Sequence, residues 1–181
     1  SNSSAASDVY KRQCIKAGKN VDMVKIPEVF LGITFWEKCS AIWKDMVEKI
    51  DGGIPRFYKR RDVLSFGLFQ PLSLWEDLDL YQRLRERGRK DGWCKARIVH
   101  VEPYTNSQIL KAFTYGSSLS SSIKVRGAST LLDKLVLSIR VSAAILRSRI
   151  DLRLKLGSLF FAFIKGLVHI LGLFLSPFKR K

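Results

Sequence analysis

The sequence predicts a mixed α/β fold that is followed by two further helices. Short β-rich runs, among them Val21 to Ile26 and Arg97 to Val101, alternate with segments whose apolar residues recur at helical spacing. The composition shifts near Gly127, after which the chain becomes more apolar and more basic. The stretch from Gly157 to Ser176 is almost continuously apolar. We therefore divide the chain into residues 1–13, 14–127 and 128–181.

The amino-terminal part is expected to contribute one strand and one helix. Residues 1–13 are small and polar and lack a start methionine, so we expect a non-native linker or adapter. Val21 to Ile26 predicts a short strand at the edge of a sheet, because Pro27 stops it. The next segment predicts an amphipathic helix that Asp51, Gly52 and Gly53 end. Its apolar residues are Phe35, Trp36, Cys39, Ile42, Trp43, Met46, Val47 and Ile50.

The central part is expected to add an extended segment, two helices and a strand. Ile54 to Tyr58 is extended and leads into a basic cluster, Lys59 to Arg61. A helix is expected from Ser73 to Gly88, a strand from Arg97 to Val101 and a helix from Ser107 to Ser121.

Asp77 departs from the pattern of its own helix. At 100° per residue, Leu74, Leu78, Leu80, Tyr81 and Leu84 fall on one arc. Asp77 lies within that apolar arc. An ionised carboxylate that faces a core costs several kcal/mol unless it is paired or has a function. We therefore expect Asp77 either to have a buried partner or to line a cavity, and we interpret it as a catalytic base.

The neighbouring acidic residues have structural explanations. Ser73 and Glu76 have the spacing of a capping box, and Gly88 follows a basic last turn. Asp79 and Arg83 lie four residues apart, where a surface ion pair contributes roughly 0.3 to 0.5 kcal/mol. A buried ion-pair network would also explain Asp77, since such networks perturb acids as active sites do.

The wider sequence resembles the carboxyl half of family 2 glycosyltransferases, which have the GT-A fold. The resemblance runs over roughly residues 21 to 120. It is carried, in order, by Pro55, Arg56 and Phe57, by the basic turn Lys59 to Arg61, by Gly67 to Phe69, by Glu76, Asp77, Asp79, Leu80 and Arg83, and by Ile98 to Glu102.

The resemblance implies roles for five residues. Asp77 would take the proton from an acceptor hydroxyl as that oxygen attacks and inverts the anomeric carbon of a nucleotide-activated sugar. Arg56, Glu76 and Arg83 would belong to the substrate-binding set. His100 is a candidate for binding the divalent metal, Mg or Mn, or the diphosphate in the intact enzyme. A histidine on an apolar strand face is also a common core residue, and an arginine such as Arg56 is commonly a surface residue.

Two family features are missing from this sequence. The Asp-x-Asp motif that holds the metal and the nucleotide diphosphate should precede the resembling region, and nothing upstream of Val21 supplies it. The parallel strands of the nucleotide-binding half are also not found there. We expect the chain to be a fragment, a partial GT-A domain without its amino-terminal half, and to be inactive by itself.

The tail predicts association with a membrane. Leu131 to Leu154 is expected to be one basic amphipathic helix of the kind that lies on anionic lipid. Its apolar stripe comprises Leu132, Leu135, Ile139, Ala143, Leu146, Ile150 and Leu154. Gly157 to Ser176 is close to the roughly 20 residues that span a bilayer core, but Lys165 and His169 interrupt it. Basic residues on both flanks favour a hairpin or an in-plane helix, and a soluble helical subdomain is the alternative.

Charge and cysteine content agree with a membrane-associated protein on the cytoplasmic side. The chain has 32 Lys and Arg against 16 Asp and Glu, a net charge of +16, which favours acidic partners. No nucleic-acid-binding motif accompanies the basic clusters. The three cysteines lack zinc-site or disulfide spacing, which favours reduced thiols.

We expect a fragment of a membrane-associated inverting glycosyltransferase. Its expected partners are a nucleotide-sugar donor and membrane lipid, and its expected acceptor is a lipid-linked or polysaccharide hydroxyl. The alternatives are a non-catalytic basic membrane-binding or scaffold protein and, third, a nucleic-acid-binding module.

Overall fold

The computed structural model describes residues 12–13, 15–69, 76–102, 105–126 and 129–175. The fold is mixed α/β, as the sequence predicts. The described chain forms two compact units. The first unit contains residues 12–29, 53–69 and 76–98, and the second contains residues 30–52 and 99–175.

The first unit is built around a three-stranded sheet in the order β3-β1-β4. Strand β1 (Met23–Lys25) pairs antiparallel with β3 (Phe57–Tyr58) and parallel with β4 (Asp91–Trp93). Its backbone carbonyls accept hydrogen bonds on both sides, from Arg56 N–H to Val24 and from Cys94 N–H to Lys25. The expectation of an edge strand was therefore wrong, because later segments of the chain cover both sides of β1.

Alternating residues of β1 face two small cores of the first unit. Met23 packs with Leu80, Tyr81 and Leu84 of helix α4 (Glu76–Glu86). Val24, on the other face of the strand, packs with Ile26 and Cys94. This alternation follows from the two-residue repeat of an extended chain. Helix α4 thus covers one face of the sheet with its apolar side chains.

One helix of the first unit agrees with the sequence and one was not expected. α3 (Arg60–Ser65) begins directly after Lys59, where the sequence predicts only a basic turn. α4 (Glu76–Glu86) ends before Gly88, whose φ of 74° is in the left-handed region that favours glycine. Ser73, the expected partner of Glu76 in a capping box, lies outside the described residues.

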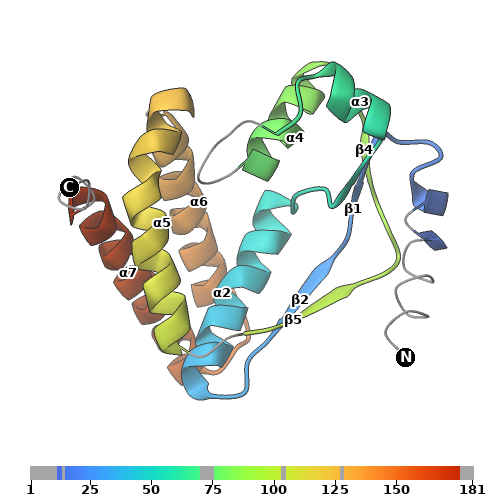
Figure 1. Ribbon diagram of the computed structural model, residues 1–181. Coiled ribbons are helices and arrows are strands. Elements are labelled where there is room, and N and C mark those ends of the chain that lie inside the picture. Colours follow the sequence, from blue (N-terminus) through green and yellow to red (C-terminus); the bar gives the residue numbers. More distant parts are fainter. Residues whose placement is uncertain (1–11, 14, 70–75, 103–104, 127–128, 176–181) are drawn as a thin grey trace, which may run out of the picture. The chain divides into compact units, whose positions relative to one another are not determined.

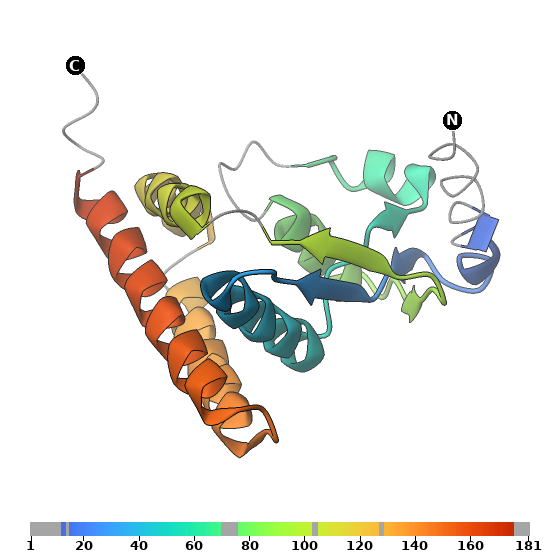
Figure 2. The ribbon, with the colours of Figure 1, turned by 90° about the horizontal axis from the view of Figure 1, so that it is seen from below.

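Two strands, β2 (Glu28–Leu31) and β5 (Ile98–Val101), form a separate two-stranded sheet. Figure 2 shows them side by side. The Ile98 N–H donates to the Pro27 carbonyl, and the Glu102 N–H donates to the Leu31 carbonyl. These two bonds advance in the same direction along both strands, so the pairing is parallel. β5 confirms the strand that the sequence predicts.

Helix α2 (Phe35–Asp51) agrees with the helix predicted in the amino-terminal part. Thr34 and Glu37 form a capping box at its start, and Gly52, at a φ of 77°, caps its end. Trp36 lies 6.0 Å from Phe160 and 6.4 Å from Phe161, measured between ring centroids. The tryptophan therefore contacts other aromatic side chains, which agrees with a packing role.

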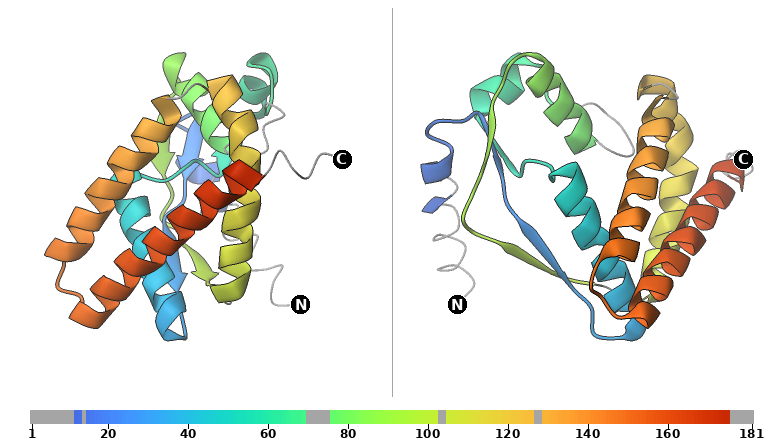
Figure 3. Two further views of the ribbon diagram at one scale, coloured as in Figure 1. Left: turned by 90° about the vertical axis from the view of Figure 1, so that its left-hand side faces the viewer. Right: turned by 180° about the vertical axis from the view of Figure 1, so that it is seen from behind.

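Three more helices complete the second unit, and Figures 1 and 3 show them alongside one another. They are α5 (Thr105–Arg126), α6 (Ser129–Arg147) and α7 (Leu152–Leu175). The single helix expected from Leu131 to Leu154 was wrong, because α6 ends at Arg147. The Asp151 side chain accepts the N–H groups of Arg153 and Leu154 at 2.9 and 3.4 Å, and so starts a new helix.

Candidate functional site

Asp77 lies in the first turn of α4, where its carboxylate is accessible. Its side chain is 38% exposed, whereas Leu80 and Leu84 are completely buried on the same arc. The expected burial of Asp77 was therefore wrong. The apolar arc is buried in the middle of the helix, at Leu80 and Leu84, but it is partly exposed at the first turn, where Asp77 lies.

Arg56 is the basic residue closest to this carboxylate. Its guanidinium Nη1 lies 3.8 Å from Oδ2 of Asp77, which is a loose ion pair. Its Nε donates to Glu28 Oε1 at 2.8 Å, so Glu28 is the stronger partner. The Asp77 Oδ1 atom accepts the N–H of Leu78 at 2.8 Å. The structure thus brings together two predicted site residues and leaves the Asp77 carboxylate only loosely paired.

Tyr58 is a member of this group that sequence reasoning missed. Its hydroxyl is buried and has no hydrogen-bond partner within the described part of the chain. Burial raises the pKa of Tyr58, and the negative charge of Asp77 raises it further. The phenol therefore stays protonated and can donate a hydrogen bond. The only signal for Tyr58 in the sequence was its place beside Phe57, at the end of the extended segment that begins with Ile54.

Glu76 and Arg83 occupy different positions on α4. Glu76 is the first residue of the helix and is exposed. Arg83 forms the predicted ion pair with Asp79 at 2.8 Å. Its two terminal nitrogens also donate to the carbonyls of Phe66 and Leu68 at 2.5 and 2.6 Å. These contacts hold the turn after α3, which is a structural function for the Arg83 guanidinium.

His100 belongs to the second unit, so the structure does not place it in one site with Asp77. Its ring stacks on Phe30 with a centroid distance of 5.3 Å. His100 also lines a cavity of about 440 Å³. No group of three or more His, Cys, Asp or Glu side chains suited to a metal occurs within residues 12–175 as far as these are described.

The cavity beside His100 contains a buried polar network. Glu102 is buried and accepts hydrogen bonds at 2.8 Å from Lys44 Nζ on both carboxylate oxygens. Ser40 donates to Glu102 at 2.9 Å and lies 2.6 Å from Oε1 of Gln108. Lys165 and His169 of α7 also line this cavity. The only signal for this grouping in the sequence was that two polar residues, Lys165 and His169, interrupt the apolar stretch from Gly157 to Ser176.

Helix α7 has an unusual distribution of polarity. The face that packs inside the unit contains Ser158, Lys165 and His169 as well as Gly157 and Phe161. From Leu156 onward the opposite face is exposed and apolar, and comprises Leu156, Phe160, Phe163, Leu167, Ile170, Leu171, Phe174 and Leu175. By length and hydropathy, α7 is the one described helix that is apolar enough to cross a membrane.

Comparisons with protein-family models, with curated proteins and with solved structures give no match for this chain.

Proposed function

We propose that this chain is part of a membrane-associated inverting glycosyltransferase of family 2 type with a partial GT-A domain, in which Asp77 is the general base. A nucleotide sugar is the proposed donor, and a lipid-linked or polysaccharide hydroxyl is the proposed acceptor. The order of the resembling segments supports the family, and the accessible carboxylate at the start of α4 supports the role of Asp77.

The single observation that carries the proposal is the loose pairing of the Asp77 carboxylate. A general base must reach the proton that it removes, so a tight buried ion pair would block it. Asp77 Oδ2 is 3.8 Å from Arg56, whose guanidinium is held by Glu28, and both side chains are partly exposed. An acceptor hydroxyl can therefore approach the carboxylate.

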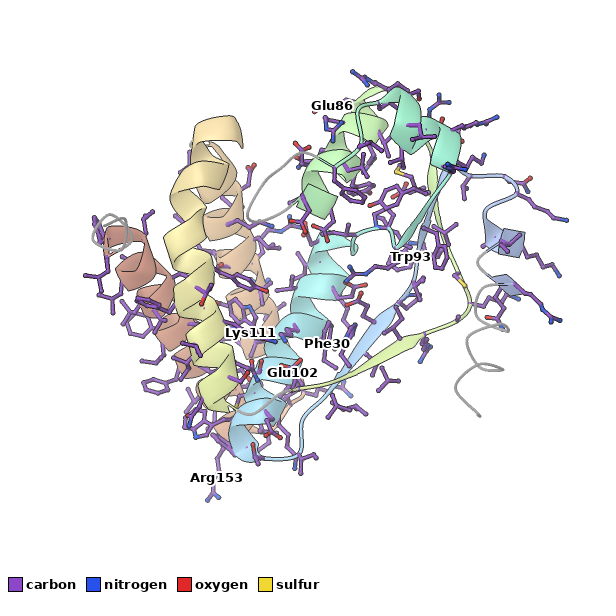
Figure 4. All side chains as sticks on the ribbon, viewed as in Figure 1. Phe30, Glu86, Trp93, Glu102, Lys111 and Arg153 are labelled. Atoms are coloured by element: carbon purple, nitrogen blue, oxygen red, sulfur yellow. The ribbon has the colours of Figure 1, made fainter. Side chains whose placement is uncertain are left out.

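The proposal is tested by replacing Asp77 with Asn in the protein expressed from its complete reading frame. Loss of a general base reduces turnover by about 10² to 10⁴-fold. The matched control is Glu86→Gln, which removes one negative charge from the exposed carboxyl end of the same helix (Figure 4). Transfer of labelled sugar is measured in membranes with a panel of nucleotide sugars. Unchanged transfer by Asp77→Asn would contradict the assignment.

The second candidate function is binding to a membrane surface without catalysis. The distribution of side chains on α7 favours it, because water-soluble helices place polar residues outward and apolar residues inward. Here the exposed face is apolar and the polar residues face the other helices. Four basic residues, Arg147, Arg149, Arg153 and Lys155, surround the turn between α6 and α7, where they suit anionic headgroups.

Vesicle flotation tests this second function. The double substitution Phe163→Gln and Leu167→Gln removes two apolar side chains from the exposed face of α7. Binding to vesicles of phosphatidylcholine and phosphatidylglycerol should fall at least about tenfold, because each buried side chain contributes roughly 1.5 to 3 kcal/mol. The control is Leu64→Gln, which removes an exposed leucine from α3. Equal binding by both variants would exclude α7 as the membrane contact. Loss of sugar transfer in Asp77→Asn with normal flotation would show that catalysis and membrane binding are separate.

A further inference from the structure

The cavity of the second unit has more positive than negative charge. Its lining includes three lysines, Lys44, Lys111 and Lys165, and two histidines, His100 and His169. Glu102 is the only acidic residue among the lining residues. Its carboxylate is already engaged by Lys44 and Ser40, at 2.8 and 2.9 Å. Lys44 therefore has an ion-pair partner, whereas Lys111 and Lys165 form no ion pair with a described carboxylate.

Lys165 is the residue whose position requires an explanation. It extends from the mainly apolar middle of α7 toward the cavity, and none of the described carboxylates forms an ion pair with it. Its Nζ atom lies 5.6 Å from the centroid of the Phe161 ring. A partly buried ammonium group without a carboxylate is costly, and ionisable residues in apolar helices usually mark a binding site or an ion pathway.

We propose that this cavity binds a phosphate ester, with Lys165 and Lys111 as its principal contacts. Lysine is a common phosphate ligand because its compact charge suits several phosphate oxygens. The volume of about 440 Å³ is within the range of small-molecule sites, so the cavity can hold an organic group as well as the phosphate. Figure 4 shows Phe30, Glu102 and Lys111 converging from β2, the end of β5 and α5.

The other lining residues fit this ligand. The stacked pair of Phe30 and His100 gives the cavity an aromatic wall, and Tyr115 adds a hydroxyl that can bind an ester oxygen. The Glu102 carboxylate would repel a phosphate, but Lys44 neutralises it through two short hydrogen bonds. The site includes none of the residues proposed for sugar transfer except the metal candidate His100, so it does not depend on that function.

Calorimetric titration of the full chain in a neutral detergent tests the proposal. The probes are two phosphate monoesters, glycerol 3-phosphate and micellar phosphatidic acid. Glycerol is the reference without phosphate, and phosphatidylcholine, a zwitterionic phosphodiester, is the lipid reference. Saturable binding of either phosphate probe is expected. Saturation by glycerol 3-phosphate would identify a soluble ester as a sufficient ligand, and saturation by phosphatidic acid alone would identify a lipid headgroup. Absence of saturation with both probes would overturn the proposal.

Two charge variants locate the binding. Lys165→Gln should weaken binding by at least about tenfold, because a charge-assisted contact is lost. The matched control is Arg153→Gln, which removes one positive charge from the exposed start of the same helix and should change affinity less than about twofold (Figure 4). Equal weakening by the two variants would show a general charge effect and would overturn the site.

A measurement on the unmodified chain covers the case in which Lys165→Gln does not fold. Amine methylation followed by mass spectrometry reports the reactivity of each lysine. Saturating glycerol 3-phosphate or phosphatidic acid should slow the modification of Lys165 and Lys111 and leave the exposed Lys38 of α2 unchanged. Identical protection of Lys38 and Lys165 would contradict the proposal. Lys111→Gln, at an exposed position of the cavity rim, provides the second variant for titration.

Discussion

Gly116 of α5 lies directly against the backbone of His169 in α7. A Cβ atom at position 116 would lie 2.1 Å from the His169 carbonyl oxygen, which is far inside van der Waals contact. Since the nearest atoms are backbone atoms, a small rotation of a side chain cannot relieve the clash. The close approach of the two helices, and with it the cavity wall formed by His169, depends on glycine at this position.

Gly116→Ala should therefore destabilise the second unit. Alanine normally favours a helix over glycine by about 0.8 to 1 kcal/mol, so destabilisation would show that the clash outweighs helix propensity. The control is Gly166→Ala in α7, where the added Cβ meets no atom within 4 Å and stability should increase by up to about 1 kcal/mol. Denaturant unfolding in detergent, followed by circular dichroism, measures both. An increase in stability for Gly116→Ala would refute this packing.

Glu102→Gln should destabilise the polar network of the second unit by about 1 to 3 kcal/mol, since it leaves Lys44 without its carboxylate. The value is below that of a fully buried pair because the Lys44 side chain is 35% exposed. Asp45→Asn provides the comparison, because Asp45 pairs with Lys49 on the surface of α2 and should contribute no more than about 0.5 kcal/mol. Free energies of unfolding of the two variants are measured by urea titration. Equal losses would mean that burial of the pair is unimportant.

Acid should weaken the first unit through Asp22. The Lys59 side chain and the Lys90 N–H, at 2.9 and 3.1 Å, hold the pKa of Asp22 below its ordinary value of 3.8. Because the folded-state pKa is the lower one, the stabilisation is present above the unfolded-state value and is lost as pH falls through the folded-state value. The free energy of unfolding should therefore fall more steeply below pH 3.8 for the original chain than for Asp22→Asn. Parallel pH profiles for the two proteins would exclude this contribution.

Lys165→Met should leave the ligand-free protein as stable as before, or increase its stability. Methionine has a similar length, and it removes a partly buried charged group that forms no ion pair with any described carboxylate. Thermal unfolding without phosphate measures this effect. A large loss of stability would mean that Lys165 stabilises the fold directly, which would contradict a role limited to binding.

Local sequence signals predicted α2 and α4 well, because the ends of these helices depend on neighbouring residues, whereas α3 was not predicted. Gly52 and Gly88 adopt the left-handed conformation that ends a helix, and the predicted limits of α2 and α4 follow from them. The central position of β1 could not be predicted in this way. It depends on pairing with β3 and β4, which lie more than 30 residues later in the chain.

The candidate site was predicted in part. Arg56 and Asp77, which the resemblance places in one site, lie close together in the structure. The burial of Asp77 was overestimated. Helical periodicity predicts which face of a helix is apolar, but it does not predict which turns of that face other elements cover. The cavity network was missed, since Ser40, Glu102 and Lys165 come from distant segments with no common motif. Such a network is determined by helix packing, which a single sequence does not specify.

The cap that Asp151 supplies has a consequence for how the tail could enter a lipid bilayer. Because α7 starts anew at this residue, Arg147, Arg149, Arg153 and Lys155 are gathered at one hairpin bend and are not spread along a continuous rod. Moving that bend across a hydrocarbon layer would mean transferring four cations together, which insertion energetics strongly disfavour. The hairpin bend would therefore stay with the headgroups of the leaflet that it first meets. The basic residues Lys179, Arg180 and Lys181, which follow α7 in the sequence, disfavour transfer of the other end in the same way.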